Sequence, residues 1–295
     1  MQINYSFIIP HKNCPDLLQR CVDSIPERDD VQVIVVDDNS DEGKKPALKE
    51  HKNMQVILLD ASQSKGAGRA RNVGLKHAEG KWLLFPDSDD FYTEGFLAVL
   101  DKYTDEDIEV LYFNSDCVDS KTLSRMPSRL KKYNKMVEDS IKNADAFFKL
   151  RCLHNAPWTK MVKKEFVTKN DIEFEETING NDMMFSHYVG YLTQKSFIIS
   201  EKLYVYTTSN NGLSMQKNSI EVWMSRIDHN YKQRQFFKYI QHPEWKSISF
   251  FNYYIKYFSD KPILGIKVLW NHLKNLNKFK IDEMKYVVFL EKRRK

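Results

Sequence analysis

Two tight clusters of acidic side chains each follow an apolar segment. Asp37 and Asp38 end the run VQVIVVDD, and the second cluster is the aspartates of PDSDD, residues 86–90. Three carboxylates within four residues repel one another unless a cation compensates their charge. Carboxylate oxygens suit Mg²⁺ and Mn²⁺, which can bridge the oxygens of a diphosphate. PDSDD therefore predicts a site for Mn²⁺ or Mg²⁺, and N-capping of a following helix is the structural alternative.

Alternating strands and helices must position these clusters. The apolar runs predict strands over residues 3–9, 31–38, 54–60, 81–85, 108–114 and 196–200, and the helical spacing predicts helices over 65–80, 94–103 and 139–153. This alternation is typical of an α/β fold with a mainly parallel central sheet flanked by helices. Ligands of such sheets bind beyond the carboxyl ends of the strands, so the polar clusters at 10–13, 37–40 and 87–90 should meet there.

Five motifs in order carry a resemblance to a known family. They are SFIIPHKN, LLQRCVDSI, VIVVDDNSDE, GAGRARNVGLKHAEGKWLLF and PDSDD. The stretch from Ser6 to Tyr92 resembles the nucleotide-binding half of glycosyltransferase family 2, whose members are inverting enzymes. The resemblance implies the GT-A nucleotide-diphospho-sugar transferase fold, here with a helical C-terminal extension.

The resemblance also implies donor-binding residues. Asp38 would accept a hydrogen bond from the uracil N3–H of the donor, which a carboxylate pairs with well, while Asp37 would support the turn. Arg71 and Asn72 match the family's ARN motif, in which the arginine faces the nucleotide. Asp89 would ligate the metal ion. The remaining candidates are Asp87, toward the ribose or the metal ion, and Pro10, Lys12 and Asn13 after the first strand.

One departure concerns the base of the donor. Family members often carry an aromatic residue after the first strand that stacks on the base, whereas this chain has Pro10-His11-Lys12-Asn13. His11 could provide the stacking, or the aliphatic stem of Lys12 could cover the ring. The identity of the base is therefore less firmly implied than the presence of a nucleotide.

The acceptor half should supply a general base, because a single displacement needs one opposite the leaving diphosphate. By the resemblance, the segment APWTKMVKKEFVTKNDIEFEETINGND places Asp182 at the base, with Asn181 replacing the usual glutamate. Loss of that negative charge should lower the pKa of Asp182. N-capping of the next helix is the alternative for both residues. Trp158 would line the acceptor pocket or lie in the core, and the fallback bases are Glu173, Glu175 and Glu176.

These residues together imply transfer of a sugar from a UDP-linked donor to a hydroxyl of a glycan or lipid-linked glycan, as in surface polysaccharide synthesis. A catalytically inactive GT-A protein that only binds its ligand is one alternative, and a nucleotidyltransferase is another. The segment IIPHKNC contains no glycine, which argues against the glycine-rich loop of a nucleotidyltransferase or of a dinucleotide-binding enzyme.

Charge and hydropathy predict the organisation of the chain. We expect a catalytic domain over residues 1–217, with a nucleotide-binding half (1–92) and an acceptor half (93–217), and a helical basic region over 218–295. No apolar run reaches the ~18 residues of a membrane span, so we expect a cytoplasmic protein. The basic surplus is C-terminal and lacks a nucleic-acid motif. The helical stripe in 261–280 predicts either an anionic membrane surface as partner or packing on the core.

Overall fold

The structure is a computed structural model that describes residues 2–208 and 220–245, and residues 262–263, 265–267, 269–271 and 273–274. The chain forms two compact units. The N-terminal unit comprises Met1–Glu176 and Asn181–Gly212, and the C-terminal unit comprises Thr177–Gly180 and Leu213–Lys295. The boundary predicted between residues 217 and 218 lies outside the described residues.

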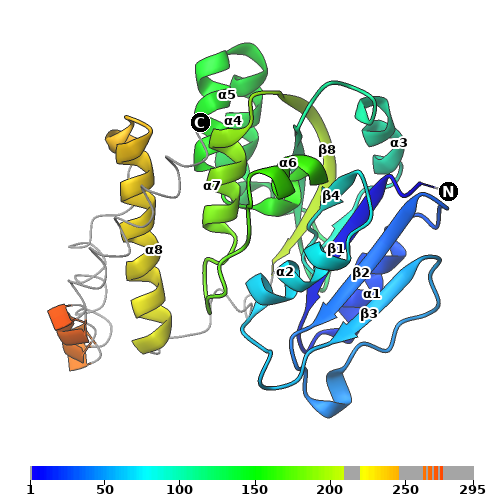
Figure 1. Cartoon of the computed structure of the whole chain (residues 1–295), viewed down its shortest axis with the longest axis horizontal. Helices are drawn as coiled ribbons and strands as arrows, with labels where there is room; N and C mark the ends of the chain where they lie inside the picture. Colours follow the sequence, from blue (N-terminus) through cyan, green and yellow to red (C-terminus); the bar gives the residue numbers. More distant parts are fainter. Residues whose placement is uncertain are drawn as a thin grey trace. The chain divides into compact units, whose positions relative to one another are not determined.

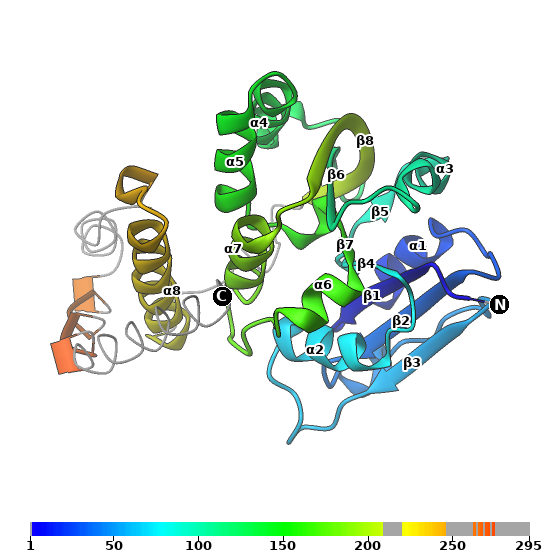
Figure 2. The same cartoon turned by 45° about the horizontal axis from the view of Figure 1, so that its top comes forward.

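An eight-stranded sheet forms the centre of the N-terminal unit, with the strand order β3-β2-β1-β4-β7-β6-β8-β5 (Figures 1 and 2). The strands are β1 (Tyr5–His11), β2 (Val31–Asp37), β3 (Met54–Leu58), β4 (Trp82–Leu84), β5 (Phe91–Tyr92), β6 (Val110–Asp119), β7 (Lys160–Lys163) and β8 (Ser196–Thr208). The predicted strands are present, and β5 and β7 are additional to them.

Strand order reverses beside β1, because β1 pairs with β2 on one side and with β4 on the other. Both pairings are parallel, as is the pairing of β2 with β3. β7 then runs antiparallel between β4 and β6, β8 is parallel to β6, and β5 is antiparallel to β8. The mainly parallel sheet that the sequence predicts is confirmed, with the antiparallel pairings confined to β5 and β7.

Helices of the N-terminal unit lie on both faces of the sheet. They are α1 (Pro15–Asp23), α2 (Ala67–His77), α3 (Phe96–Leu100), α4 (Lys131–Lys142), α5 (Ala144–Leu153), α6 (Lys164–Lys169) and α7 (Met183–Leu192). The single helix predicted over 139–153 is wrong. Asn143 has an extended backbone and its side chain accepts a hydrogen bond from Ala146 N, so it ends α4 and caps α5.

Alternating side chains of β1 explain how α1 and α2 cover opposite faces of the sheet (Figure 2). Tyr5, Phe7 and Ile9 belong to the core cluster that also contains the buried residues of α1 and α3. Ile8 points the other way and contacts α2 at Gly74. The loops that leave β1, β2 and β4 at their carboxyl ends are therefore held between fixed helices.

α7 is buried on nearly all sides, which its sequence MMFSHYVGYL permits because it carries no charged residue. It packs with α5, which in turn packs with α4 (Figure 1). Phe185 of α7 stacks on Phe174 with 3.9 Å between ring centroids, and Phe85 after β4 contacts both rings edge-on. These contacts fix the start of α7 next to the carboxyl end of β4.

The described part of the C-terminal unit consists of α8 (Ile220–Tyr239) and helical residues between 262 and 274. Within the helical region predicted over 218–295, residues 246–261 lie outside the described residues. Of the helices that the structure describes, none has the length and apolar content that crossing a membrane requires.

Candidate active site

The polar clusters predicted from the sequence meet at the carboxyl ends of β1, β2 and β4. His11 and Asp37 are register partners at the ends of β1 and β2, and Asp87 follows β4. This edge lies at the point where strand order reverses, which is the usual ligand-binding position of open α/β sheets.

His11 and Asp37 hold the turn between β1 and β2 together. Both are buried, and His11 Nδ1 lies 2.7 Å from Asp37 Oδ1. Because the backbone N–H of Cys14 donates to His11 Nε2, the ring proton must be on Nδ1, where it bonds Asp37. The N–H and hydroxyl of Ser40 also donate to Asp37. The proposed stacking of His11 on a base is therefore wrong, since its ring is enclosed and both nitrogens are engaged.

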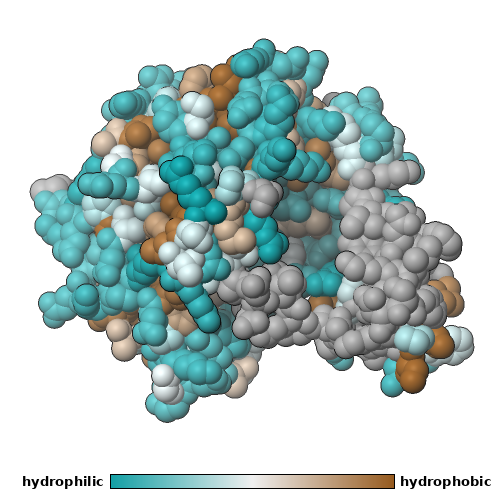
Figure 3. Space-filling view, turned by 180° about the vertical axis from the view of Figure 1, so that it is seen from behind, coloured by the Kyte–Doolittle hydropathy of each residue, from teal (hydrophilic) through white to brown (hydrophobic). Residues whose placement is uncertain are grey.

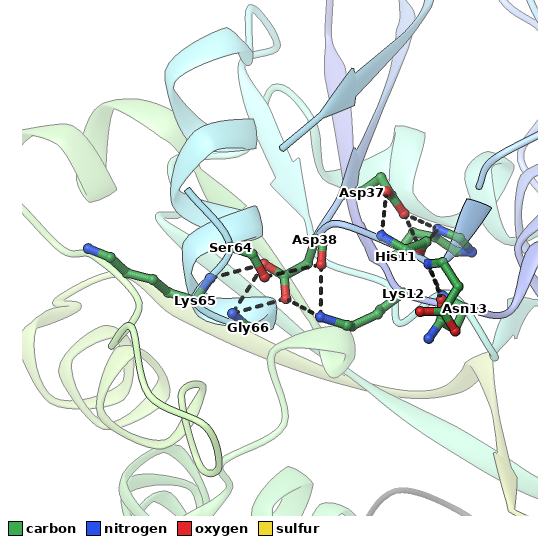
Figure 4. A network of polar contacts seen from close by, with 10 residues as sticks. His11, Lys12, Asn13, Asp37, Asp38, Ser64, Lys65 and Gly66 are labelled. Atoms are coloured by element: carbon green, nitrogen blue, oxygen red, sulfur yellow. Dashed lines mark hydrogen bonds and ion pairs between the residues drawn. The ribbon is translucent and has the colours of Figure 1, made fainter. Parts of the chain in front are cut away.

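Asp38 faces the entrance of α2 (Figure 4). Its carboxylate accepts hydrogen bonds from the backbone N–H groups of Lys65 and Gly66, and Lys12 Nζ lies 3.4 Å away. Lys12 Nζ also donates to the Asp38 carbonyl oxygen, at 2.9 Å. A base N3–H that bonds Asp38 must therefore displace the long contact with Lys12, whose half-exposed side chain is free to move aside.

Pro10 and Asn13 stabilise the end of β1 and the turn that follows it. Pro10 is a buried member of β1 that pairs with Val36. Asn13 has a positive φ of 60°, which asparagine tolerates, and its side-chain oxygen accepts from Asp41 N while its backbone N–H donates to Ser40 Oγ. Of the four donor candidates at this position, the structure brings Lys12 and Asp38 together and commits Pro10 and Asn13 to the turn.

Arg71 of α2 connects the two halves of the N-terminal unit. Its buried guanidinium donates through Nη2 to Asp87 Oδ1 at 2.5 Å and through Nη1 to Asn181 Oδ1 at 2.8 Å. It also lies over the Phe174 ring, 5.3 Å from the centroid. The arginine thus fixes an aspartate of PDSDD and the residue beside Asp182 within one constellation.

Asn72 has a different role from the one that the resemblance implies. Its side-chain nitrogen donates to Phe174 O at 2.9 Å, and its side-chain oxygen accepts from Phe174 N at 2.8 Å. The buried amide thereby bonds both backbone polar groups of Phe174, as the backbone of a neighbouring strand would. This geometry gives no support to a donor-binding role for Asn72, because both polar atoms are used to hold the acceptor half.

Gly68 makes a close approach to the loop that carries Asn181. A Cβ atom at this position would overlap the carbonyl oxygen of Glu175 and lie 2.9 Å from Asn181 Cβ. The N–H of Glu175 donates to Asn181 O, which closes the loop on itself. Glycine is required here because backbone and loop touch directly.

The aspartates of PDSDD are not equivalent. Their nearest carboxylate oxygens all lie within 4.8 Å of one another. Asp90 is fully buried and accepts from Tyr204 Oη and Thr207 N, so both of its oxygens are committed to β8. Asp89 carries an exposed side chain for which the described residues provide no side-chain partner, and Asp87 keeps one oxygen beside the one that bonds Arg71.

Electrostatics favour a cation at this cluster. Desolvation of the carboxylate by its surroundings and the charge of Asp87 raise the pKa of Asp89 from 3.8 to about 6. Burial and the negative charges of Asp89 and Asp87 raise the pKa of Asp90 well above its ordinary value. N-capping, the structural alternative, is excluded because the next helix, α3, begins at Phe96 with Gly95 as its cap. Asp89 and Asp87 therefore fit a divalent cation, whereas Asp90 is a structural residue.

Asp182 occupies the N-cap position of α7, yet its side chain makes no capping hydrogen bond. The half-buried carboxylate is thus available for other chemistry. Burial raises the pKa of Asp182, and the positive charge of Arg71 partly opposes that rise. The lowering expected from the Asn181 replacement is therefore outweighed by desolvation. Among the fallback bases, Glu176 forms ion pairs with Lys65 and Arg69.

Trp158 lies in the core and not on an acceptor surface. Only 7% of the residue is exposed. Its ring is stacked between Tyr204 and Tyr206, with centroids 4.9 and 5.6 Å away. Of the two readings that the sequence left open, the structure supports the packing one. Tyr206 is the partly exposed end of this stack.

Comparison with known proteins agrees with this geometry. The family model for "Glycosyl transferase family 2" matches residues 6–166, more than half of the chain. The chain belongs to glycosyl transferase family 2. The match spans β1 to β7 and includes the strand ends, α2 and PDSDD described above.

Curated members of family 2 resemble the chain over most of its length. Poly(ribitol-phosphate) beta-N-acetylglucosaminyltransferase TarS of Staphylococcus aureus is 27% identical over 222 residues, covering 72% of this chain but 37% of TarS. The chain thus spans little more than a third of that relative. Glycosyltransferase GlyG of Streptococcus pneumoniae is 24% identical over 252 residues, covering 75% of this chain and 79% of GlyG.

A solved family 2 structure has the same fold. Residues 1–349 of Staphylococcus aureus TarS, crystallised in complex with UDP-GlcNAc, superpose with a TM-score of 0.62 at 21% identity. The superposition covers 97% of this chain and 82% of the TarS chain. The GT-A fold predicted from the sequence is therefore confirmed.

Three residues of this family 2 site were not among the sequence candidates. Tyr204 donates to Asp90 and accepts from Asp87 N, and Arg20 of α1 donates to the carbonyl oxygen of Asp89. Lys160 is fully buried near Asp182. Only Lys160 carried a local signal, the W-x-K spacing after Trp158, since the partners of the other two are far away in sequence.

Proposed function

We propose that this chain is a metal-dependent, inverting glycosyltransferase that moves a sugar from a UDP-linked donor to a hydroxyl of a glycan or lipid-linked glycan, as in surface polysaccharide synthesis. The observation that carries the proposal is the double contact of Arg71 with Asp87 and Asn181. It sets the donor-side aspartates and the candidate base Asp182 around one guanidinium, which is the arrangement that a single displacement needs.

Each residue then has a chemical role. Asp182 accepts the proton of the acceptor hydroxyl as its oxygen attacks the anomeric carbon, and the bond from that carbon to the diphosphate breaks on the opposite side. Arg71 places positive charge beside the departing diphosphate. Mn²⁺ or Mg²⁺ held by Asp89 and Asp87 would neutralise the leaving group. The exposure of the Asp89 residue and its raised pKa support this assignment.

Two observations support a UDP-linked donor. The buried carboxylate of Asp38 follows the end of β2, where it can accept from an imide N–H once Lys12 moves aside. TarS, which has the same fold, was crystallised with UDP-GlcNAc. Its name specifies poly(ribitol phosphate) as acceptor, and we propose a related class of anionic or lipid-linked glycan for this chain.

The decisive experiment measures UDP release from UDP-GlcNAc and UDP-glucose, with poly(ribitol phosphate) or a diphosphate-lipid-linked sugar as acceptor. We expect release that requires Mn²⁺ or Mg²⁺ and rises with acceptor. Asp182→Asn should bind the donor normally and lose on the order of 10²–10⁴ in turnover. Glu165→Gln, an exposed carboxylate on α6, is the control and should match the wild type. A chain that binds UDP but releases none from any donor would instead be a binding protein.

We also propose that residues 1–217 form the catalytic domain and that the basic region 218–295 brings it to the cytoplasmic face of a membrane. The supporting observation is a stripe of exposed apolar side chains at helical spacing: Ile263, Ile266, Trp270 and Leu273. Figure 3 shows hydrophobic atoms at the surface of this segment, which is orange in Figure 1. The Lys274 ammonium lies 5.3 Å from the Trp270 ring centroid, a pairing suited to a lipid interface.

Sedimentation with phosphatidylglycerol vesicles tests this association. The wild type should sediment in a salt-sensitive way, and the double variant Ile266→Ser/Trp270→Ser should not. Ile141→Ser on α4 removes another exposed isoleucine, from the N-terminal unit, and serves as the control. Equal sedimentation with anionic and neutral vesicles would refute an electrostatic association, since each Lys or Arg near an anionic surface contributes about 1 kcal/mol.

A further inference from the structure

A lysine is completely enclosed within the acceptor half. Lys160 is the first residue of β7 and has no solvent exposure. Its ammonium donates to the carbonyl oxygens of Ala156 and His154 and lies 3.4 Å from Ser186 Oγ. These three acceptors match the three protons of an ammonium group. Burying a charge is nevertheless costly unless an opposite charge compensates it, so the position of this lysine needs an explanation.

The candidate base Asp182 is near this lysine. Burial lowers the pKa of Lys160 to about 7, and the charge of Asp182 opposes this effect. Among the described residues, His154, His187 and Tyr112 are further titratable groups near the ammonium. Burial together with Lys160 lowers the pKa of both His154 and His187, and burial raises the pKa of Tyr112.

A hydrogen-bonded path joins the two residues. Lys160 contacts Ser186 Oγ in the first turn of α7, and the Ser186 N–H donates to the Asp182 carbonyl oxygen at 3.0 Å. The Ser186 hydroxyl donates to Asn155 O, in the segment that also supplies the Ala156 carbonyl. The lysine therefore ties the start of α7, and with it Asp182, to β7 and the segment before it.

We propose that Lys160 is a positioning residue for the reaction, which acts through Asp182 by fixing the first turn of α7 and by adding positive charge near the base. This proposal rests on the proposed function, in which Asp182 is the base. The groups that face Asp182 are Arg71 from α2, Asp87 after β4 and Lys160 from β7. Removal of Lys160 leaves Arg71 as the positive member of this set.

Lys160→Met separates this role from simple packing. Methionine fills most of the volume but takes away the ammonium that donates to the carbonyl oxygens of His154 and Ala156, so the variant should unfold at a lower temperature than the wild type. Its KM for the donor should stay within about twofold, while kcat should fall roughly 10- to 100-fold, as for a misplaced catalytic group. Loss of the positive charge should also move the acid limb of kcat/KM to higher pH, because Asp182 would bind its proton more tightly.

Two further variants complete the test. Lys164→Met is the control, because Lys164 follows the other end of β7 and its ammonium donates to the Ala78 carbonyl oxygen. This variant should leave kcat and the pH profile unchanged. In the double variant Lys160→Met/Asp182→Asn, the turnover should equal that of Asp182→Asn alone, since the lysine acts through the base. Additive losses would overturn the proposal, as would a Lys160→Met variant that unfolds earlier but keeps its kcat and pH profile.

Failure of this inference is distinguishable from failure of the proposed function. If Asp182→Asn keeps wild-type turnover, the base is assigned wrongly and the proposed mechanism fails. If Asp182→Asn is inactive but Lys160→Met retains full turnover with an unshifted acid limb, the base stands and the role of Lys160 is refuted.

Discussion

Substitution of Gly68 by alanine tests whether α2 and the base-carrying loop must touch. The new Cβ would overlap the Glu175 carbonyl oxygen and lie 2.9 Å from Asn181 Cβ, whereas ordinary contacts begin at 3.4 Å. The loop must therefore retreat by at least 0.5 Å from the helix at Asn181 (3.4 − 2.9) and further at Glu175. Such a retreat stretches the 2.8 Å bond from Arg71 to Asn181 and moves Asp182 with it.

The expected magnitudes follow from this displacement. Overpacking costs about 1–3 kcal/mol. The better helix propensity of alanine offsets up to about 1 kcal/mol of this loss in stability. We therefore expect a net loss of about 1 kcal/mol in the free energy of unfolding. A shift of the base by a fraction of an ångström to 1 Å should lower kcat on the order of 10- to 100-fold.

The assay compares urea unfolding, calorimetric UDP binding and kcat for Gly68→Ala with those for Gly43→Ala. A Cβ at Gly43 meets open space, so that control should match the wild type in all three. Donor affinity of Gly68→Ala should be nearly unchanged, because the donor-side aspartates do not move. Wild-type kcat in a variant that has lost stability would refute the view that this contact positions the base.

Three other results are expected. Asp89→Ala should fold normally, because the exposed side chain has no side-chain partner among the described residues, and should lose Mn²⁺-dependent UDP binding in calorimetry; unchanged affinity would place the metal elsewhere. Tyr204→Phe should lower the free energy of unfolding by about 1–3 kcal/mol, since Asp90 loses a buried donor; a neutral effect in urea titration would contradict this. Burial lowers the pKa of His187 from 6.5 to about 3, so the unfolded state alone gains a proton as pH falls below 6.5. Between pH 7 and 5 the wild type should therefore lose about 2 kcal/mol more stability than His187→Gln; parallel pH curves would exclude this assignment.

The sequence predicted the donor edge well because its signals are local. The apolar runs before His11, Asp37 and Asp87 fix where each strand ends, and parallel pairing then brings those ends together. Sheet topology requires little more than alternation of strands and helices. The aspartates of the acidic clusters were therefore placed correctly without knowledge of their partners.

The contacts between the two halves could not be predicted in the same way. Asn72 bonds Phe174, and Gly68 touches the carbonyl of Glu175, more than 100 residues further along the chain. An asparagine or glycine at the start of a helix looks the same from sequence whether it meets a phosphate or another loop. Likewise, the break between α4 and α5 depends on one capping asparagine, Asn143, within an otherwise continuous helical pattern.

The first two turns of α2 have a consequence for recombination among related enzymes. They carry Gly68, Arg71 and Asn72, which hold Phe174, Glu175 and Asn181 by close contact and by hydrogen bonds. A chimera that joins the donor half of one enzyme to the acceptor half of another at a boundary near residue 92 separates these partners. Such chimeras should fold and be active only when the two turns and their partner residues come from the same parent enzyme. Recombination in this fold is therefore limited by a contact surface and not by a continuous segment of sequence.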